Sequence, residues 1–189
     1  MLFNTRKIKA TKLNPIFDRP GVYFVSQSTL TAAFSTFHQY VRALNDAGWA
    51  KRAGVIAAES SLVPYLPVRS NLFLNGNEHN LNVLPRQMRN SSFLNQQSSE
   101  LHGIDILIVQ LFREILAGKQ IIVTGTVLDR LSGPEIRAFL SVAKAACTEQ
   151  AVSLIIITTN ADLAATAGHS LTEAPEIMVT NRLKQGSPT

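Results

Sequence analysis

Five short apolar runs recur along this chain and limit how it can fold. The runs occupy residues 21–25, 54–58, 120–124, 154–158 and 176–181. A strand that is apolar at nearly every position is covered on both faces of its sheet. Because segments with helical periodicity separate the runs, the strands are joined by crossover connections, which link parallel strands. The sequence therefore predicts a three-layer α/β fold around a mainly parallel sheet.

Apolar residues spaced three or four apart predict helices between these strands. The first helical stripe consists of Leu30, Phe34, Phe37, Val41 and Leu44. A later helix follows Ser132, which forms a capping box with Glu135. The acidic residues that we expect to cap or flank helices are Asp129, Glu135 and Asp162. Residues 75–100 are rich in Asn, Gln and Ser with few apolar anchors, which predicts an irregular or loosely packed insert rather than core.

The composition narrows the classes of function. Hydrophobic residues make up 46% of the 189 residues and charged residues 16%, which indicates a globular domain with an extra face to bury against a partner. No apolar run approaches the roughly 20 residues that span a bilayer. The single Cys147 fits a reducing compartment, so we expect a cytoplasmic protein. The net charge is +5, yet no nucleic-acid motif or Cys/His cluster occurs, so we expect neither nucleic acid nor zinc.

The stretch "GVYFVSQSTLTAAF", residues 21–34, passes from strand to helix as a phosphate-binding loop does. A helix N-terminus offers free backbone N–H groups to an anion. Hydroxyl groups are present at Ser28 and Thr29, but the glycines and the lysine of a P-loop are missing. The candidate cofactor-binding residues are therefore Ser26, Gln27, Ser28 and Thr29, as the remnant of a phosphate loop.

Taken in order, these elements resemble the nucleotide-binding subunit of ATP-binding-cassette (ABC) transporters from about residue 21 to residue 186. The stretch "AGVIAAESSLVPYLPVRSNLFL" is similar to the Q-loop strand and the segment after it. The stretch "LHGIDILIVQLFREILAGKQIIVTGTVLDRLSGPE" is similar to the signature helix and the Walker B strand, with Arg113 at the arginine of that helix. The resemblance implies one P-loop NTPase domain of ABC type over residues 1–189, with a reduced helical subdomain at about 66–118.

The positions that carry the chemistry of this family depart from its pattern. By this resemblance, the replaced residues are Ala58 for the Q-loop Gln, His102 for the signature Ser, Gly125 and Thr126 for the Walker B acids, and Thr159 for the switch His. Gln27 likewise stands at the phosphate-loop Lys. Phosphoryl transfer depends on positioning and charge neutralisation, and losing one preorganised group costs about 10²–10³ in rate. We therefore expect no ATP hydrolysis, no metal site and no resident cofactor; ATP and Mg²⁺ could bind only if the remnant loop still holds phosphate.

The resemblance also implies a partner. In the family, the segment after the Q-loop strand faces the membrane subunit, and the matching residues here are Leu62, Tyr65, Leu66 and Arg69. Such a patch is equally compatible with buried core. The resemblance implies a catalytically inactive subunit that serves a membrane subunit or an active ATPase subunit, or forms a dimer, at the inner face of the membrane. The alternatives are a weak nucleotide or anion binder, an enzyme of unrelated chemistry, and a basic nucleic-acid binder.

Overall fold

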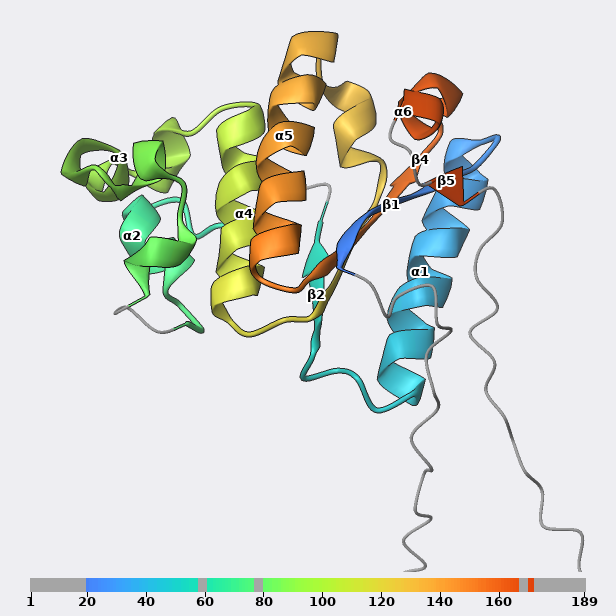
Figure 1. Cartoon of the computed structure of the whole chain (residues 1–189), viewed down its shortest axis with the longest axis horizontal. Helices are drawn as coiled ribbons and strands as arrows, with labels where there is room; N and C mark the ends of the chain where they lie inside the picture. Colours follow the sequence, from blue (N-terminus) through green and yellow to red (C-terminus); the bar gives the residue numbers. More distant parts are fainter. Residues whose placement is uncertain (1–19, 58–60, 77–79, 167–169, 172–189) are drawn as a thin grey trace, which may run out of the picture.

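A five-stranded parallel sheet forms the centre of the molecule in the computed structural model (Figure 1), which describes residues 20–57, 61–76, 80–166 and 170–171. The strands are β1 (Gly21–Ser26), β2 (Ala53–Ile56), β3 (Ile121–Thr124), β4 (Ser153–Thr158) and β5 (Ser170–Leu171). Their order in the sheet is β2-β3-β4-β1-β5. The predicted mainly parallel α/β sheet is confirmed, whereas the predicted strand at 176–181 lies outside the described residues.

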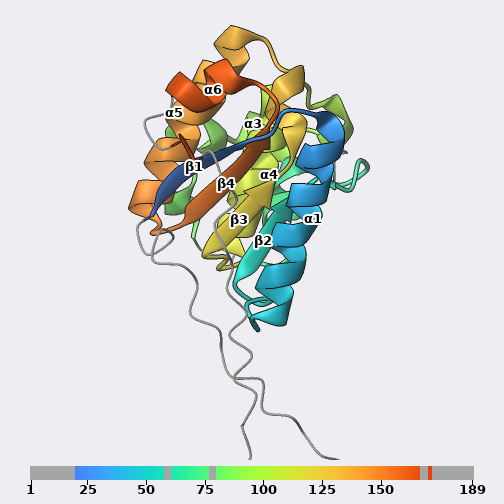
Figure 2. The ribbon, with the colours of Figure 1, turned by 90° about the vertical axis from the view of Figure 1, so that its right-hand side faces the viewer.

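Strand β4 separates β1 from β3, so three successive strands end at one edge of the sheet. Ser26 at the end of β1 pairs with Thr158 at the end of β4, and Thr124 of β3 pairs with Ile156. Because both pairings are parallel, the segments that follow these three strands lie at the same carboxyl edge (Figure 2). In open α/β sheets this edge is the usual place for a ligand.

Helices cover both faces of the sheet, as predicted for three layers. Helix α1 (Leu30–Asp46) lies on one face, where its buried side pairs with strand residues such as Val25, Val123 and Ile155. The other face carries the larger core and the helices α4 (Ile104–Leu116) and α5 (Gly133–Glu149) (Figure 2). The short helix α6 (Ala161–Thr166) follows β4. Alternate residues of each central strand enter one core or the other, which explains why the strands are apolar throughout.

The predicted stripe of α1 faces the sheet only in part, since Leu44 is buried and Phe37 packs against the smaller core. Leu30 and Phe34 are 66% and 67% exposed, whereas Ala33 and Tyr40 are 1% and 2% exposed. Because each residue turns a helix by about 100°, Ala33 and Tyr40 lie on the side of α1 next to the predicted stripe. The buried side consists of Ala33, Thr36, Tyr40 and Leu44, and Leu30 and Phe34 remain in contact with solvent.

The segment between β2 and β3 is a compact insert, and the prediction of loose packing was wrong. Its elements before α4 are α2 (Val68–Leu72), η2 (Leu81–Val83), η3 (Arg86–Arg89), α3 (Ser91–Asn95) and η4 (Ser98–Glu100). Leu84, Met88 and Leu94 are at most 4% exposed and belong to the larger core, so a few apolar anchors suffice to hold the polar chain between them. Figure 1 shows this insert beside α4, on the side away from α1. The single domain over 1–189 and its subdomain at 66–118 stay predictions.

Candidate functional site

The loop after β1 uses its polar groups within the fold. The Gln27 backbone N–H donates to the carbonyl of Thr158 at 2.9 Å, and the Thr29 hydroxyl accepts from the Ala32 N–H at 3.1 Å as the N-cap of α1. Ser28 and Thr29 are exposed, and Gln27 and Ser26 are half-buried. The side chain at Thr29 thus satisfies one of the free donors of the helix, which is the ordinary task of an N-cap threonine.

A carboxylate lies at the end of β4, where the resemblance places the switch histidine. Asp129, in the 3-10 helix η5 (Thr126–Arg130), accepts from the Thr159 N–H and the Thr159 hydroxyl, each at 2.8 Å. It also accepts from the hydroxyl of Thr158. The hydroxyl of Thr158, a fully buried residue, in turn accepts from the Asn160 N–H at 3.0 Å. Asp129 therefore brings a negative charge to the carboxyl edge and closes the end of β4 with its own hydrogen bonds.

Further carboxylates lie in the first turns of the other helices that begin at this end. Asp105, Glu135 and Asp162 lie in the first turns of α4, α5 and α6. Ser132 donates to Glu135 from its N–H at 2.8 Å and from its hydroxyl at 2.6 Å, and these bonds lower the pKa of Glu135. The four residues after each of β1, β3 and β4 include no Lys or Arg. The N-termini of these helices, where a bound anion is favoured, therefore carry carboxylates rather than cationic side chains.

The remaining family positions give little chemistry to this edge. Gly125 supplies only backbone, and a Cβ there would lie 3.8 Å from the Phe37 ring. Thr126 opens η5, and His102 is exposed. Ala58 lies outside the described residues. Within the described ranges, no group of three or more His, Cys, Asp or Glu side chains could hold a metal ion.

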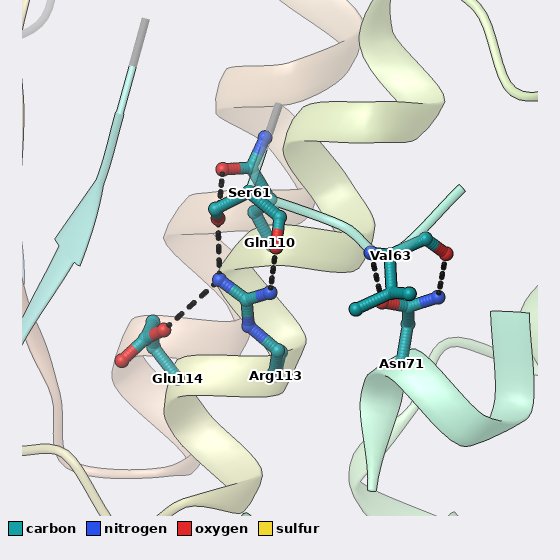
Figure 3. A network of polar contacts seen from close by, with 6 residues as sticks. All are labelled: Ser61, Val63, Asn71, Gln110, Arg113 and Glu114. Carbon is teal, nitrogen blue, oxygen red and sulfur yellow. Dashed lines mark hydrogen bonds and ion pairs between the residues drawn. The ribbon is translucent and has the colours of Figure 1, made fainter. Parts of the chain in front are cut away.

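A second polar site fixes the loop after β2 and belongs to the candidate partner surface. Figure 3 shows Arg113 of α4 directed at Ser61: Nη1 donates to the Ser61 carbonyl at 2.9 Å and Nη2 to its hydroxyl at 2.6 Å. The same hydroxyl donates to Gln110 at 3.1 Å. Gln110 and Arg113 are 1% and 9% exposed, whereas Ser61 is exposed, so the network is partly buried. Nη2 also lies 3.4 Å from the carboxylate of Glu114.

The next part of the loop is held by one buried amide. Asn71 of α2 is fully buried; its Oδ1 accepts from the Val63 N–H at 2.7 Å and its Nδ2 donates to the Val63 carbonyl at 2.9 Å (Figure 3). Nδ2 also donates to the Ser98 hydroxyl at 2.8 Å. The Ser98 N–H bonds the Leu66 carbonyl at 3.1 Å. The loop from Ser61 to Leu66 is therefore tied to α4, to α2 and to the chain at Ser98.

This held loop presents only part of the predicted patch to solvent. Tyr65 is 76% exposed, Arg69 is exposed and Leu66 is half-buried. Leu62 is 7% exposed and packs in the larger core, so it has to be removed from the predicted contact residues. Leu62, which follows Ser61 in sequence, packs inward, whereas the turn at Pro64 and Tyr65 faces solvent. Tyr65, Leu66 and Arg69 remain candidate partner-contact residues because each is at least partly exposed.

Known proteins provide a comparison at the level of fold. No family model and no curated protein matches the sequence. The solved structure of cbiO1 from Clostridium perfringens, described as part of the ABC transporter complex cbiONQ, matches with a TM-score of 0.58. The match covers 77% of this chain and 69% of that chain. The chain has the fold of an ABC transporter ATPase subunit. At 9% identity the likeness concerns the fold alone.

Two groups that organise this ABC ATPase fold were not assigned their roles from the sequence. Asp129 was expected only to cap or flank a helix, and Ser61 had no expected role. Their partners lie 30 and 52 residues away, at Thr159 and Arg113 respectively. The available signal was the pair of polar residues Gln110 and Arg113 in an otherwise apolar stretch of α4, since buried polar groups require hydrogen-bond partners. No helix among the described residues is long and apolar enough to cross a bilayer.

Proposed function

We propose that this chain is a non-hydrolysing relative of ABC ATPase subunits that serves as a structural or regulatory partner in an ABC transporter complex. The fold supports the family assignment, and cbiO1 is itself described as part of such a complex. The chain would bind a membrane subunit or an active ATPase subunit, or pair with a second copy. Its place would then be the cytoplasmic side of the membrane, held there by the partner.

The proposed loss of ATP hydrolysis is supported mainly by the carboxylate of Asp129, which lies at the carboxyl edge of the sheet. It accepts three hydrogen bonds from Thr158 and Thr159 at the end of β4. A phosphate about 5 Å from a carboxylate is repelled by about 3 kcal/mol at an effective dielectric constant of about 20. The four residues after each of β1, β3 and β4 include no lysine or arginine, and Arg130, which follows Asp129, is exposed. Nucleotide binding would therefore lack both the attraction and the geometry that phosphoryl transfer requires.

The partner surface would be the loop from Ser61 to Leu66 together with Arg69. Preorganised loops lose little conformational entropy on binding, and exposed tyrosine and arginine side chains are common anchors of protein interfaces. The bonds from Asn71 and Arg113 hold this loop before any partner arrives. The proposed task of the chain is accordingly to supply shape and contacts rather than chemistry.

The test is titration of the full chain with ATP and Mg²⁺ by calorimetry, with thermal unfolding and phosphate release measured in parallel. We expect no heat, no shift in melting temperature and no phosphate release at millimolar ATP. Binding at about 100-fold excess over Kd would stabilise the native state by about 2.7 kcal/mol, so a missing shift is informative. Micromolar binding without phosphate release would instead favour the alternative, a weak nucleotide or anion binder at residues 26–29, and phosphate release would overturn both.

A further inference from the structure

Helix α1 carries a patch of large apolar and aromatic side chains that the described residues leave open. Leu30 and Phe34 are 66% and 67% exposed. The ring centroid of Phe34 lies 4.3 Å from that of His38, and His38 lies 5.5 Å from Phe37 in the same measure. Leu30 is four residues before Phe34, a spacing that makes the two side chains neighbours on the helix surface. These four residues form one surface, called here the α1 patch.

The α1 patch lies on the face of the sheet that α1 covers, over β2, β3 and β4 (Figure 2). Phe37 packs against the smaller core, and its ring lies 3.8 Å from the position of a Cβ on Gly125, just after β3. Val55 in β2 is 37% exposed and pairs with Val123, which belongs to the smaller core. Paired residues point to the same face of a sheet, so Val55 adds apolar surface on the side of α1.

The exposed apolar area is small for an interface with a separate molecule. A phenylalanine side chain buries about 150–250 Å² when fully covered, so the exposed two-thirds of Phe34 offers about 100–170 Å². With similar amounts from Leu30 and less from Val55, the total is roughly 300 Å², whereas a stable interface buries about 800 Å² on each partner. A segment of the same chain needs less area, because a short tether holds it at millimolar effective concentration.

Two terminal segments of the chain, 1–19 and 172–189, lie outside the described residues. The second contains the run 176–181, which the sequence predicts as a further strand, and it follows β5 at the end of the sheet opposite β2. No strand or core position is predicted for the first. Between residues 6 and 19 its large apolar side chains are Ile8, Leu13, Ile16 and Phe17. The first segment is therefore the better candidate for the α1 patch.

Residues 1–19 are long enough to reach the α1 patch. They precede Gly21, which pairs with the same residue of β4 as Ile121 of β3 does, so Gly21 lies two strand spacings from β3, about 10 Å. Gly125, next to the α1 patch, is four residues farther along the chain than Ile121, or about 13 Å. Eight extended residues span about 26 Å, so Leu13 can reach the patch from Gly21.

We propose that residues 6–17 of this chain pack against the α1 patch, with Ile8 and Leu13 as the apolar contacts. The cations of the segment, Arg6, Lys7, Lys9 and Lys12, alternate with these two residues and keep their charged ends in water. The inference goes beyond the proposed function, since it assigns an occupant to a surface that neither ATP nor a partner protein requires. The segment would hold α1 directly after residues 26–29.

The test is hydrogen–deuterium exchange of the full chain, read by mass spectrometry. We expect the amides of residues 6–17 to exchange at least about tenfold more slowly than in a free peptide of that sequence. Phe34→Asp should remove this protection, and so should Leu13→Asp, which changes no described residue. Leu74→Asp is the matched control, because Leu74 is 51% exposed just after α2 and should leave the exchange of residues 6–17 unchanged.

Exchange of residues 6–17 at the rate of the free peptide would overturn the inference, and so would protection that survives both Phe34→Asp and Leu13→Asp. Protection of residues 172–189 that Phe34→Asp removes would overturn it in favour of the other segment. Protection that is lost on dilution, with a dimer mass by light scattering, would overturn it in favour of a second copy. None of these readouts depends on ATP, so the inference and the proposed function fail separately.

Discussion

The Arg113 side chain on α4 donates to the backbone carbonyl of Ser61 at 2.9 Å, across 52 positions of sequence. Helix α4 lies against the sheet, and Ser61 begins the loop that presents Tyr65. The position of the exposed loop is therefore set from within the core. Any movement of the loop on partner binding would have to break this contact or carry α4 with it.

Replacing Arg113 with methionine should lower the free energy of unfolding by about 3 kcal/mol. The change removes two charged hydrogen bonds to Ser61 and leaves Glu114 without its nearest cation. Urea denaturation measures the loss. The matched control is Arg42→Met, because Arg42 forms an exposed pair with Asp46 at 3.8 Å and should change stability by no more than about 0.5 kcal/mol. Equal losses in both variants would show that the buried network contributes nothing special.

Asn71→Ala should destabilise the chain by about 1–3 kcal/mol, since it leaves the Val63 N–H without its partner and removes one of the two bonds to the Val63 carbonyl, which also accepts from the Leu66 N–H at 3.1 Å. The loop should also become accessible to protease near Tyr65, which limited proteolysis with mass spectrometry would detect. Asn45→Ala is the control, because Asn45 is exposed on α1 and should change stability by less than about 0.5 kcal/mol. An unchanged cleavage pattern in Asn71→Ala would contradict the conclusion that Asn71 holds this loop in place.

Gly54 in β2 and Gly125 just after β3 should differ in how much stability they lose when replaced by alanine. A Cβ at Gly54 would lie 2.7 Å from Oε2 and 3.2 Å from Cβ of Glu114, so Gly54→Ala should cost about 1–3 kcal/mol. A Cβ at Gly125 would lie 3.8 Å from the Phe37 ring, an ordinary contact, and that change should cost less than about 0.5 kcal/mol. Thermal unfolding of the two variants gives the comparison. A stable Gly54→Ala protein would mean that Glu114 can leave its position freely.

The pH dependence of stability should carry two opposite contributions from glutamates. Burial raises the pKa of Glu114 above its ordinary 4.5, partly offset by the charges of Arg113 and Lys119. The native state then binds more protons than the unfolded chain above pH 4.5, so this contribution to the free energy of unfolding falls as pH rises through the raised pKa. Glu114→Gln should flatten that decline in denaturation curves measured across pH 4–7.

Glu135 gives the contribution of opposite sign and serves as the matched control. Hydrogen bonds from Ser132 lower the pKa of its carboxyl below 4.5. Its stabilisation is therefore present above pH 4.5 and is lost as pH falls through the lowered pKa. Glu135→Gln should remove that acid-side loss and leave the slope above pH 4.5 unchanged. Identical curves for the two Gln variants would contradict both assignments.

Thr29→Ala should lower the free energy of unfolding by about 1 kcal/mol, because the N-cap bond to Ala32 is lost. Any affinity for ATP and Mg²⁺ should be the same before and after the change, since the hydroxyl caps the helix in our proposal. Thr31→Ala is the control within the first turn, and alanine there favours the helix. A weaker binding of ATP in Thr29→Ala, at unchanged stability, would return the residue to a phosphate site.

Much of the architecture follows from local patterns in the sequence. The run "LIIIT" at 154–158 predicted a buried strand, and β4 covers Ser153–Thr158 with every residue buried. Ser132 and Glu135 predicted the start of a helix, and both bonds of the capping box are present. Such features are readable because the partners are adjacent in sequence or because one periodicity requires one environment.

The candidate surface could be predicted only in part. Tyr65 and Arg69 were identified by resemblance and are exposed, but Leu62 was grouped with them and is buried. An exposed turn and the core position next to it in sequence can both be apolar, so the sequence did not distinguish Leu62 from its exposed neighbours. The polar residues 75–100 likewise gave no indication that Leu84 and Leu94 would enter the core.

The sequence by itself determined the four central strands and the longer helices, since each depends on residue type or on neighbours along the chain. Tertiary structure alone decided which side of α1 is buried, which loop Arg113 fixes, and where the charge of Asp129 lies. These depend on pairs of groups brought together over long separations by the sheet. A hydrogen bond of that kind satisfies buried polar atoms without leaving a periodic signal in the sequence.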